Sequence, residues 1–320
     1  SEDCDSNGDS ALSPEEIAAV TSIDIEERNI ASLEGIQYFT ALTYLDCYWN
    51  QLTSLDVSQN TALTYLQCSA NQLAELDVSK NTALTDLACE DNRLTELDLS
   101  KNTALTSLYC DYNQLNELDV SGCAALTYLE CGCNQLTELD VSKNTALIWL
   151  ACYTNGLRSL DVSKNTALEY LSSGSNQLTV MDLRTNTALD YIDLGGNQLT
   201  SLDVRGCTAL RTLYCHANRL TELDVSQNPA LQMLCCYDNK LRSLDVSQCG
   251  ELSTIPEVGE FSEDGTRLRY YYNYYREEDD ADIDLTLEYD AKTTLIYSGG
   301  TIPGETETVV AEIDEANFPD

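Results

Sequence analysis

Positive charge and histidine are scarce in this chain of 320 residues. It holds 17 Lys and Arg against 54 Asp and Glu, for a formal net charge of −37, and a single His. Phosphate binding and docking to anionic lipid both need clustered cationic side chains, so we expect no nucleic acid partner and no anionic membrane surface. A single His also disfavours the acid–base and metallohydrolase sites that use two or more.

Long apolar runs and an amino-terminal signal are absent as well. No stretch approaches the roughly 18 consecutive apolar residues of a membrane-spanning helix, so we expect no membrane insertion. The chain begins at Ser1 with neither an initiator Met nor a signal peptide, and we expect a mature or recombinant chain whose targeting sequence has been removed. Neither a G-x-S-x-G motif nor a phosphate loop occurs, so we predict that the protein is not an enzyme.

Leucine recurs at a fixed interval over most of the chain. Ten repeats of 21 residues begin at Leu42, Leu63, Leu84, Leu105, Leu126, Leu147, Leu168, Leu189, Leu210 and Leu231. A degenerate 22-residue repeat precedes them and a partial one follows, which places the repeat region at residues 20–258. So short a repeat cannot bury its own apolar face, so neighbouring repeats stack and share one core. This predicts a mostly β solenoid, with a parallel β-sheet on the concave side and short 3₁₀ or extended segments on the convex side.

The first full repeat reads LTYLDCYWNQLTSLDVSQNTA, and its L-x-x-L-x-C-x-x-N-x-L core returns in register. This pattern resembles the leucine-rich repeat family. The 21-residue period, the N-x-L-T-x-L-D-V-S-x-N run and the Cys in the inward strand column are similar to the cysteine-ladder internalins, which are bacterial surface proteins. The resemblance covers roughly residues 20–258. It implies a secreted or bacterial cell-surface protein that binds a macromolecule.

Eight of the 14 cysteines occupy one inward column of the repeats: Cys47, Cys68, Cys89, Cys110, Cys131, Cys152, Cys215 and Cys236. Neighbours in this column are expected about 4.8 Å apart, whereas a disulfide needs Cβ atoms about 3.8 Å apart in a crossed geometry. We therefore predict a ladder of reduced thiols. Cys133 and Cys235 are expected near the concave surface and are the candidates for reactivity.

Aromatic residues concentrate on the predicted concave face. Three positions per repeat point outward from the sheet, and 11 of these 30 positions are aromatic while none is Lys or Arg. Tyr and Trp offer a large contact area with a polar handle, as binding surfaces do. The predicted ligand-binding residues form two groups. The first is a row of aromatic residues from four adjacent repeats, Tyr128, Trp149, Tyr170 and Tyr191, with Tyr109, Glu130 and Tyr153 beside it. The second lies near the amino terminus and consists of Tyr44, Tyr48, Trp49 and Tyr65.

Several functions fit this face. We favour a non-catalytic, adhesin-like role for a monomer whose acidic, Tyr- and Trp-rich surface binds a host or bacterial surface protein. A glycan whose sugar faces stack on the rings is one alternative. A passive stalk or cell-wall spacer is another, because aromatic residues also stack along a sheet merely to stabilise it.

Residues 1–19 are predicted to form an amino-terminal cap. Asp5, Asn7, Asp9 and Glu16 have the spacing of oxygen ligands in an EF-hand-like calcium loop, which makes Ca²⁺ the one candidate cofactor. The usual Gly of that loop is replaced by Ser10. Another interpretation of the segment is a helix cap, with Ser13 as N-cap, Pro14 at N1 and Glu16 at N3, and the two are compatible.

Residues 259–320 change in character, with aromatic, acidic and alternating segments separated by turn signals. We predict a β-rich carboxy-terminal cap, or part of an immunoglobulin-like module. A complete column of Asp also runs through the repeats, at Asp56 and its equivalents. We interpret this column as structural, because Asp side chains bond nearby backbone in turns.

Overall fold

In the computed structural model the chain forms two compact units, Ser1–Leu178 and Thr179–Asp320. The structure describes residues 12–236, 238–241 and 248–249 in full, and the backbone alone of 243–245 and of four later strands. The first unit contains one helix, one 3₁₀ turn and eight strands of three residues: α1 Pro14–Ala19, η1 Ile36–Tyr38, β1 Ser22–Asp24, β2 Tyr44–Asp46, β3 Tyr65–Gln67, β4 Asp86–Ala88, β5 Ser107–Tyr109, β6 Tyr128–Glu130, β7 Trp149–Ala151 and β8 Tyr170–Ser172.

The second unit continues the repeats with β9 Tyr191–Asp193, β10 Thr212–Tyr214 and β11 Met233–Cys235. After them come β12 Ser243–Asp245, β13 Val258–Phe261, β14 Leu268–Asn273, β15 Asp284–Glu288 and β16 Thr294–Ile296. β12 pairs with β16 in parallel, and β13, β14 and β15 form an antiparallel sheet. The choice between a cap and part of an immunoglobulin-like module stays a prediction.

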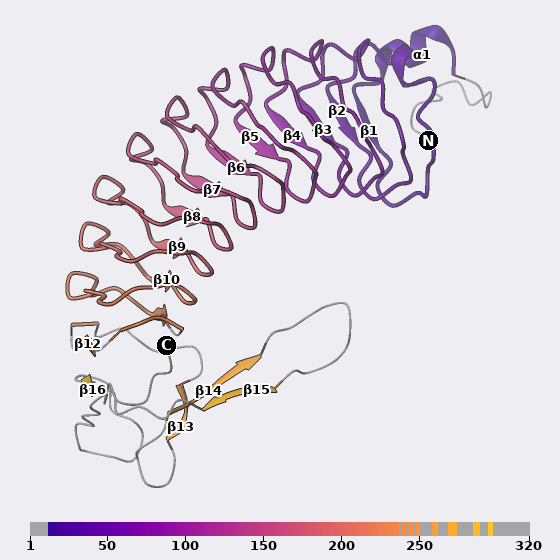
Figure 1. Cartoon of the computed structure of the whole chain (residues 1–320). Helices are drawn as coiled ribbons and strands as arrows, with labels where there is room; N and C mark the ends of the chain where they lie inside the picture. The colour runs from indigo at the N-terminus through magenta and orange to yellow at the C-terminus, as the bar shows by residue number, and fades with distance from the viewer. Residues whose placement is uncertain are drawn as a thin grey trace. The chain divides into compact units, whose positions relative to one another are not determined.

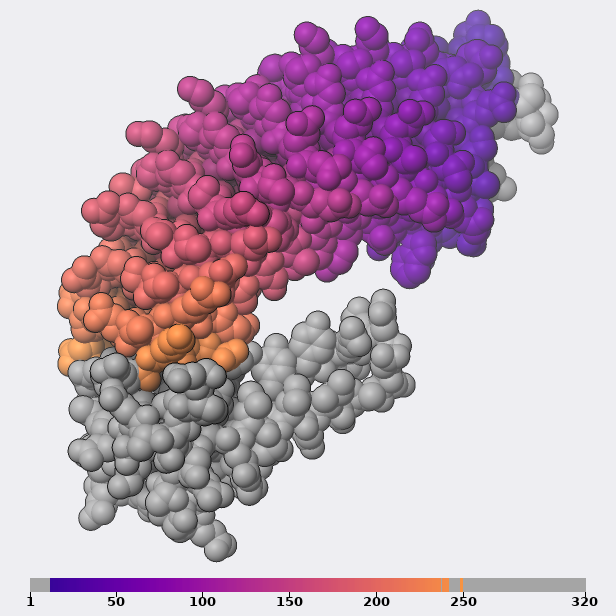
Figure 2. Space-filling view, viewed as in Figure 1, coloured from indigo at the N-terminus to yellow at the C-terminus, as the bar shows by residue number. Residues whose placement is uncertain are grey.

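The strands of the first unit lie side by side in chain order, with α1 at the end of the series next to β1 (Figure 1). All are parallel, and each residue pairs with its equivalent in the next repeat, as Tyr44 does with Tyr65. The space-filling view shows the stacked repeats of this unit closing into one continuous surface (Figure 2). The prediction of a mostly β solenoid with a parallel sheet is confirmed. On the other side of the repeats lie extended segments and turns, and η1 is the one 3₁₀ segment in the described part of the chain.

The core consists of leucine columns and the cysteine ladder. Leu42 and Leu45, with their equivalents in later repeats, are fully buried, and so is Leu52 with its equivalents as far as Leu220. The ladder residues beside them are free thiols. The Cys47 thiol donates to the carbonyl of Gln67 in the next strand (3.2 Å), and the Cys68 thiol donates in the same way one repeat later. The column therefore fills a small apolar space and also caps a neighbouring carbonyl.

Burial suppresses the reactivity of these thiols. It raises the pKa of Cys47 to about 12 and of Cys152 to about 11, so both stay protonated at neutral pH. The expected reactivity of Cys235 is wrong, because this residue is buried and its pKa is raised to about 12. Cys133 is half-buried, and burial raises its pKa as well.

An Asn, buried in most of the ten full repeats, holds the turn that follows the strand. The Asn71 amide donates to the carbonyls of Cys47, Cys68 and Ser69, and its Oδ1 accepts from the Leu52 N–H. The residue before this Asn has positive φ in repeat after repeat, for example Trp49 (47°), Ala70 (52°), Tyr112 (50°) and Thr154 (50°). The amide network therefore holds the residue before the Asn in the left-handed backbone conformation, whatever amino acid stands there.

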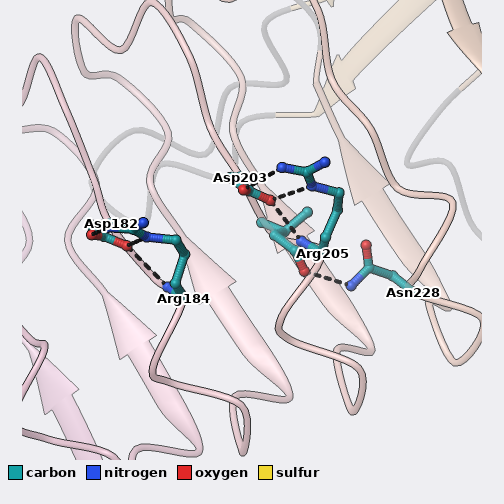
Figure 3. Close-up of polar contacts among 6 residues, drawn as sticks. Asp182, Arg184, Asp203, Arg205 and Asn228 are labelled. Atoms are coloured by element: carbon teal, nitrogen blue, oxygen red, sulfur yellow. Dashed lines mark hydrogen bonds and ion pairs between the residues drawn. The ribbon is translucent and has the colours of Figure 1, made fainter.

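The Asp column forms turns, as predicted. The Asp56 carboxylate accepts the N–H of Ser58 at 2.9 Å, and the same contact recurs through the repeats. In the second unit Arg replaces this Ser twice, and Asp182–Arg184 and Asp203–Arg205 become ion pairs of 2.6 and 2.8 Å (Figure 3). Both pairs are exposed, and such pairs contribute little to stability.

Candidate functional site

The outward side chains of the strands, together with those of the residues just beyond them, form what we call the sheet face. The central residue of each described repeat strand is a Leu or Ile, and it is buried from β2 to β11. Most of its neighbours point outward and remain partly exposed, because successive side chains of a strand alternate between the two faces. Parallel pairing in register then places the outward residues of adjacent repeats next to one another.

Near the amino terminus the sheet face carries two ring pairs. Tyr44 and Tyr65 stack with centroids 4.5 Å apart and planes within 7° of parallel, and Tyr48 meets Trp49 edge-on at 6.0 Å. Burial and the charges nearby raise the pKa of Tyr65 to about 12. The Trp49 side chain is 60% exposed. These four predicted residues therefore do come together, as two pairs.

The central aromatic row consists of Tyr128, Trp149 and Tyr170 on β6, β7 and β8. Trp149 and Tyr170 stack with centroids 3.4 Å apart and planes parallel within 1°, and Tyr128 lies 6.2 Å from Trp149 at 26°. Tyr128 is 39% exposed, so the row ends in an accessible ring. The structure thus brings together Tyr128, Trp149 and Tyr170 of the row predicted from the sequence.

The fourth residue of the predicted row, Tyr191, belongs to the second unit. There its ring lies 5.8 Å from Tyr214, tilted by 57°. Tyr214 meets the imidazole of His216 edge-on at 6.4 Å. Burial lowers the pKa of His216, although the charges of Asp193 and Asp238 act in the opposite direction.

Three carboxylates gather beside the central aromatic row, and we call Glu90, Asp111 and Glu130 the acidic cluster. Asp111 is only 7% exposed. Burial, followed by the charges of Glu90 and Glu130, raises its pKa to about 6. Burial likewise raises the pKa of Glu130, and Glu90 adds to the rise. The fold therefore holds a group of like charges on this face, and the pKa values of Asp111 and Glu130 are raised there.

No cation neutralises this cluster among the residues with described side chains, whose two ion pairs are the exposed Asp–Arg pairs of the second unit. The Oε2 atom of Glu90 is buried and accepts no hydrogen bond, and the indole N–H of Trp149 donates none. That N–H nevertheless acts on Glu130 and opposes the rise of its pKa. Buried, unpaired carboxylates destabilise a fold, and groups of this kind occur where a surface serves a ligand.

Glu130 is among the predicted ligand-binding residues, whereas Glu90 and Asp111 are not. Both stand six residues after the first Leu of their repeats, in adjacent repeats, so their proximity was visible in the spacing. Their depth was not visible. The Tyr153 hydroxyl, from a later repeat, interacts with the Asp111 carboxylate, and the spacing did not reveal that either. Tyr109 flanks the cluster, and Glu130 and Asp86 contribute to the raised pKa of its phenol after burial.

The predicted calcium ligands Asp5, Asn7 and Asp9 lie outside the described residues. Glu16 is buried in α1 and forms a capping box with Ser13. Its Oε2 accepts the Ser13 N–H and hydroxyl, both at 2.9 Å, and the Ser13 Oγ accepts the Glu16 N–H at 3.2 Å. The predicted helix and its cap are therefore confirmed. In the part of the chain that the structure describes, no three His, Cys, Asp or Glu side chains are placed to hold a metal ion.

Comparison with known proteins agrees with the fold. No protein-family model matches the chain. The structure of the functional domain of InlJ from Listeria monocytogenes, which includes a cysteine ladder, matches with a TM-score of 0.75 and 43% identity over 75% of this chain. The structure of the internalin InlF from the same organism matches with a TM-score of 0.63 over 76% of this chain and 81% of that one, and its 23% identity supports the fold alone.

Among curated proteins, internalin J of Listeria monocytogenes is 45% identical over 49 residues, which is 15% of this chain. That match spans 5% of the curated internalin J, and the chain covers 54% of the InlJ structure. None of the helices with described residues is long and apolar enough to span a membrane. By fold the chain is a leucine-rich repeat solenoid, and its sequence is similar to that of InlJ, whose structure includes a cysteine ladder.

Proposed function

We propose that this is a non-catalytic recognition protein, secreted or displayed on the bacterial cell surface, which binds a protein through the sheet face of its first unit. The observation that carries the proposal is the acidic cluster beside the central aromatic row. A fold gains nothing from holding the buried Asp111 together with the half-buried Glu90 and Glu130 without a cation, whereas a partner that supplies one gains both charge pairing and ring contact.

A protein partner fits this surface better than a glycan does. Glycan sites combine flat rings with side chains that donate and accept many hydrogen bonds, and no Arg and only one amide, Gln67, occupies the 30 outward positions of the ten full repeats. A host or bacterial surface protein with a cationic patch would associate quickly with the acidic face and would be sensitive to salt.

Two further features belong to the same proposal. The protein acts as a monomer, because an array with this net charge repels its own copies. We also propose that Asp5, Asn7 and Asp9 bind calcium, together with Glu16 if its capping box with Ser13 opens. Bound calcium would then stabilise the amino-terminal cap. A rise in melting temperature with CaCl₂ that is lost in Asp5→Asn supports calcium binding, and equal melting with CaCl₂ and with EDTA argues against it.

The test uses the purified chain and panels of intact host and bacterial cells. The double variant Trp149→Ala/Tyr170→Ala removes the stacked pair of the central aromatic row. Tyr38→Ala is the matched control, because Tyr38 is a 66% exposed ring in η1, away from the sheet strands. We expect binding of wild type and control to a responsive cell type, and loss of binding by the double variant.

The same assay separates the alternatives. Protease treatment of the cells and added NaCl abolish binding to a cationic protein partner, whereas periodate treatment abolishes binding to a glycan. Undiminished binding by the double variant would contradict the proposed surface. A chain that binds no cell type in the panel would support the alternative of a passive stalk or spacer.

A further inference from the structure

Two glycines at the same place in their repeats are covered by a ring from the following repeat. Gly132 and Gly195 both stand six residues after the first Leu, and both are buried. A Cβ atom on Gly132 would lie 2.6 Å from the ring of Tyr153, and one on Gly195 would collide with the imidazole of His216. In each case the ring lies in the space that a side chain would otherwise fill. Among the described residues, this packing of a ring over a glycine therefore occurs in both units.

Over Gly132, the ring of Tyr153 reaches the acidic cluster. Its hydroxyl interacts with the Asp111 carboxylate and partly offsets the rise of that pKa. Burial, and then the charge of Asp111, raise the pKa of Tyr153 far above its ordinary value, so the phenol remains a proton donor. Tyr112 also contacts this hydroxyl. The ring thus lies over Gly132, with its hydroxyl directed toward the acidic cluster.

A ring held in this way is suited to a cation. The face of a phenol attracts Lys and Arg, and the attraction grows when the site is partly withdrawn from water. Tyr153 is half-buried, and its hydroxyl points toward a carboxylate, which increases the electron density of the ring. Glu90, a member of the acidic cluster, has a carboxylate oxygen that accepts no hydrogen bond. Glu130 is partly buried in the same cluster.

We propose that Tyr153, laid over Gly132 beside the acidic cluster, is the platform for one cationic side chain of the partner, a Lys or an Arg. Glu90 and Glu130 supply the opposite charge beside it. Gly132 is then a positioning residue, because any side chain at this place lifts the ring off the sheet. The inference rests on the proposed function, and it names the partner's chemistry at one point of that surface.

The test measures affinity for hexalysine by titration calorimetry, with uncharged hexaserine as the comparison peptide. Gly132→Ala displaces the ring, and Tyr153→Leu removes it. Gly122→Ala is the control, because no atom lies within 4 Å of the Cβ that it introduces. We expect hexalysine to bind wild type and Gly122→Ala equally, and to bind Gly132→Ala and Tyr153→Leu about three- to tenfold more weakly.

A second readout separates positioning from simple loss of fold. In Gly132→Ala the pKa of Asp111, followed by carboxyl NMR, is expected to rise further, because the Tyr153 hydroxyl has moved away. Equal hexalysine affinities for Gly132→Ala and Gly122→Ala would overturn the proposal that Tyr153 is a platform for a cation. Equal affinities of wild type for hexaserine and hexalysine would overturn it as well. If cell binding is lost in Trp149→Ala/Tyr170→Ala but unaffected by Gly132→Ala, the proposed function stands and this inference fails.

Discussion

Replacing Asp111 by Asn is expected to stabilise the protein at neutral pH. Burial and the charges of Glu90 and Glu130 raise the pKa of Asp111 to about 6, whereas an Asp in an unfolded chain titrates near roughly 3.9. Between these two values the folded state binds more protons than the unfolded state. The contribution of Asp111 to stability is therefore greatest in acid and is lost as the pH rises through about 4 to 6.

The size of the effect follows from that difference. A shift of about two pKa units corresponds to roughly 3 kcal/mol, and solvent at the edge of the site reduces it. The amide of Asn keeps an oxygen for the Tyr153 hydroxyl. We expect Asp111→Asn to be about 1 to 2 kcal/mol more stable than wild type near pH 7.5, and equal to it within about 0.5 kcal/mol near pH 4.

Urea unfolding followed by circular dichroism at both pH values measures this difference. Asp119→Asn is the control, because it makes the same charge change in the same repeat. The Ser121 side chain, and then the Ser121 N–H that the Asp119 carboxylate accepts at 2.9 Å, lower the pKa of Asp119. The control should therefore lose stability at neutral pH, and the loss should fade in acid. A destabilised Asp111→Asn at neutral pH, or an effect independent of pH, would refute the account of the acidic cluster.

Three further predictions concern the scaffold, and urea unfolding checks each. Asn102 donates to two buried carbonyls at 3.0 and 2.9 Å, while Cys123 in the same column has longer contacts of 3.5 and 4.0 Å. We therefore expect Asn102→Ala to lower the free energy of unfolding by about 2 kcal/mol and Asn102→Cys to lower it by about half of that. The reverse order would contradict this role of the thiol. Thr154→Gly should stabilise by about 1 kcal/mol, because a β-branched residue holds φ at 50°, whereas Thr137→Gly, at ordinary φ, should destabilise. Ser13→Ala should cost about 1 kcal/mol through loss of the capping box, and an unchanged midpoint would show that α1 does not limit unfolding.

Most of the fold follows from the sequence because the repeat constrains it many times over. Each 21-residue step places the same Leu, Cys and Asn in the same environment, so an error in one repeat would be corrected by its neighbours. The capping box was predictable for a different reason, since it depends on contacts only three residues apart in sequence.

The candidate site was predictable only in part. Alternation along a strand assigns Trp149 and Tyr170 to the exposed face, and pairing in register brings them together. The tilt of a side chain is not encoded in this periodicity. Tyr153 lies over Gly132 because that one residue lacks a Cβ, and from there its hydroxyl interacts with Asp111 two repeats away. The left-handed residue of each turn was also missed, since types as different as Trp49 and Ala70 occupy it.

The most direct test of the binding surface is a map of amide chemical shifts in the deuterated chain during titration with hexalysine. The account predicts changes that concentrate on β4 to β8 and centre on the acidic cluster and the central aromatic row. It also predicts that added NaCl reverses them. Changes centred instead on the exposed Asp column of the turns, at Asp98, Asp119 and Asp140, would show that the charge of the array attracts cations without a specific surface, and would contradict the central claim.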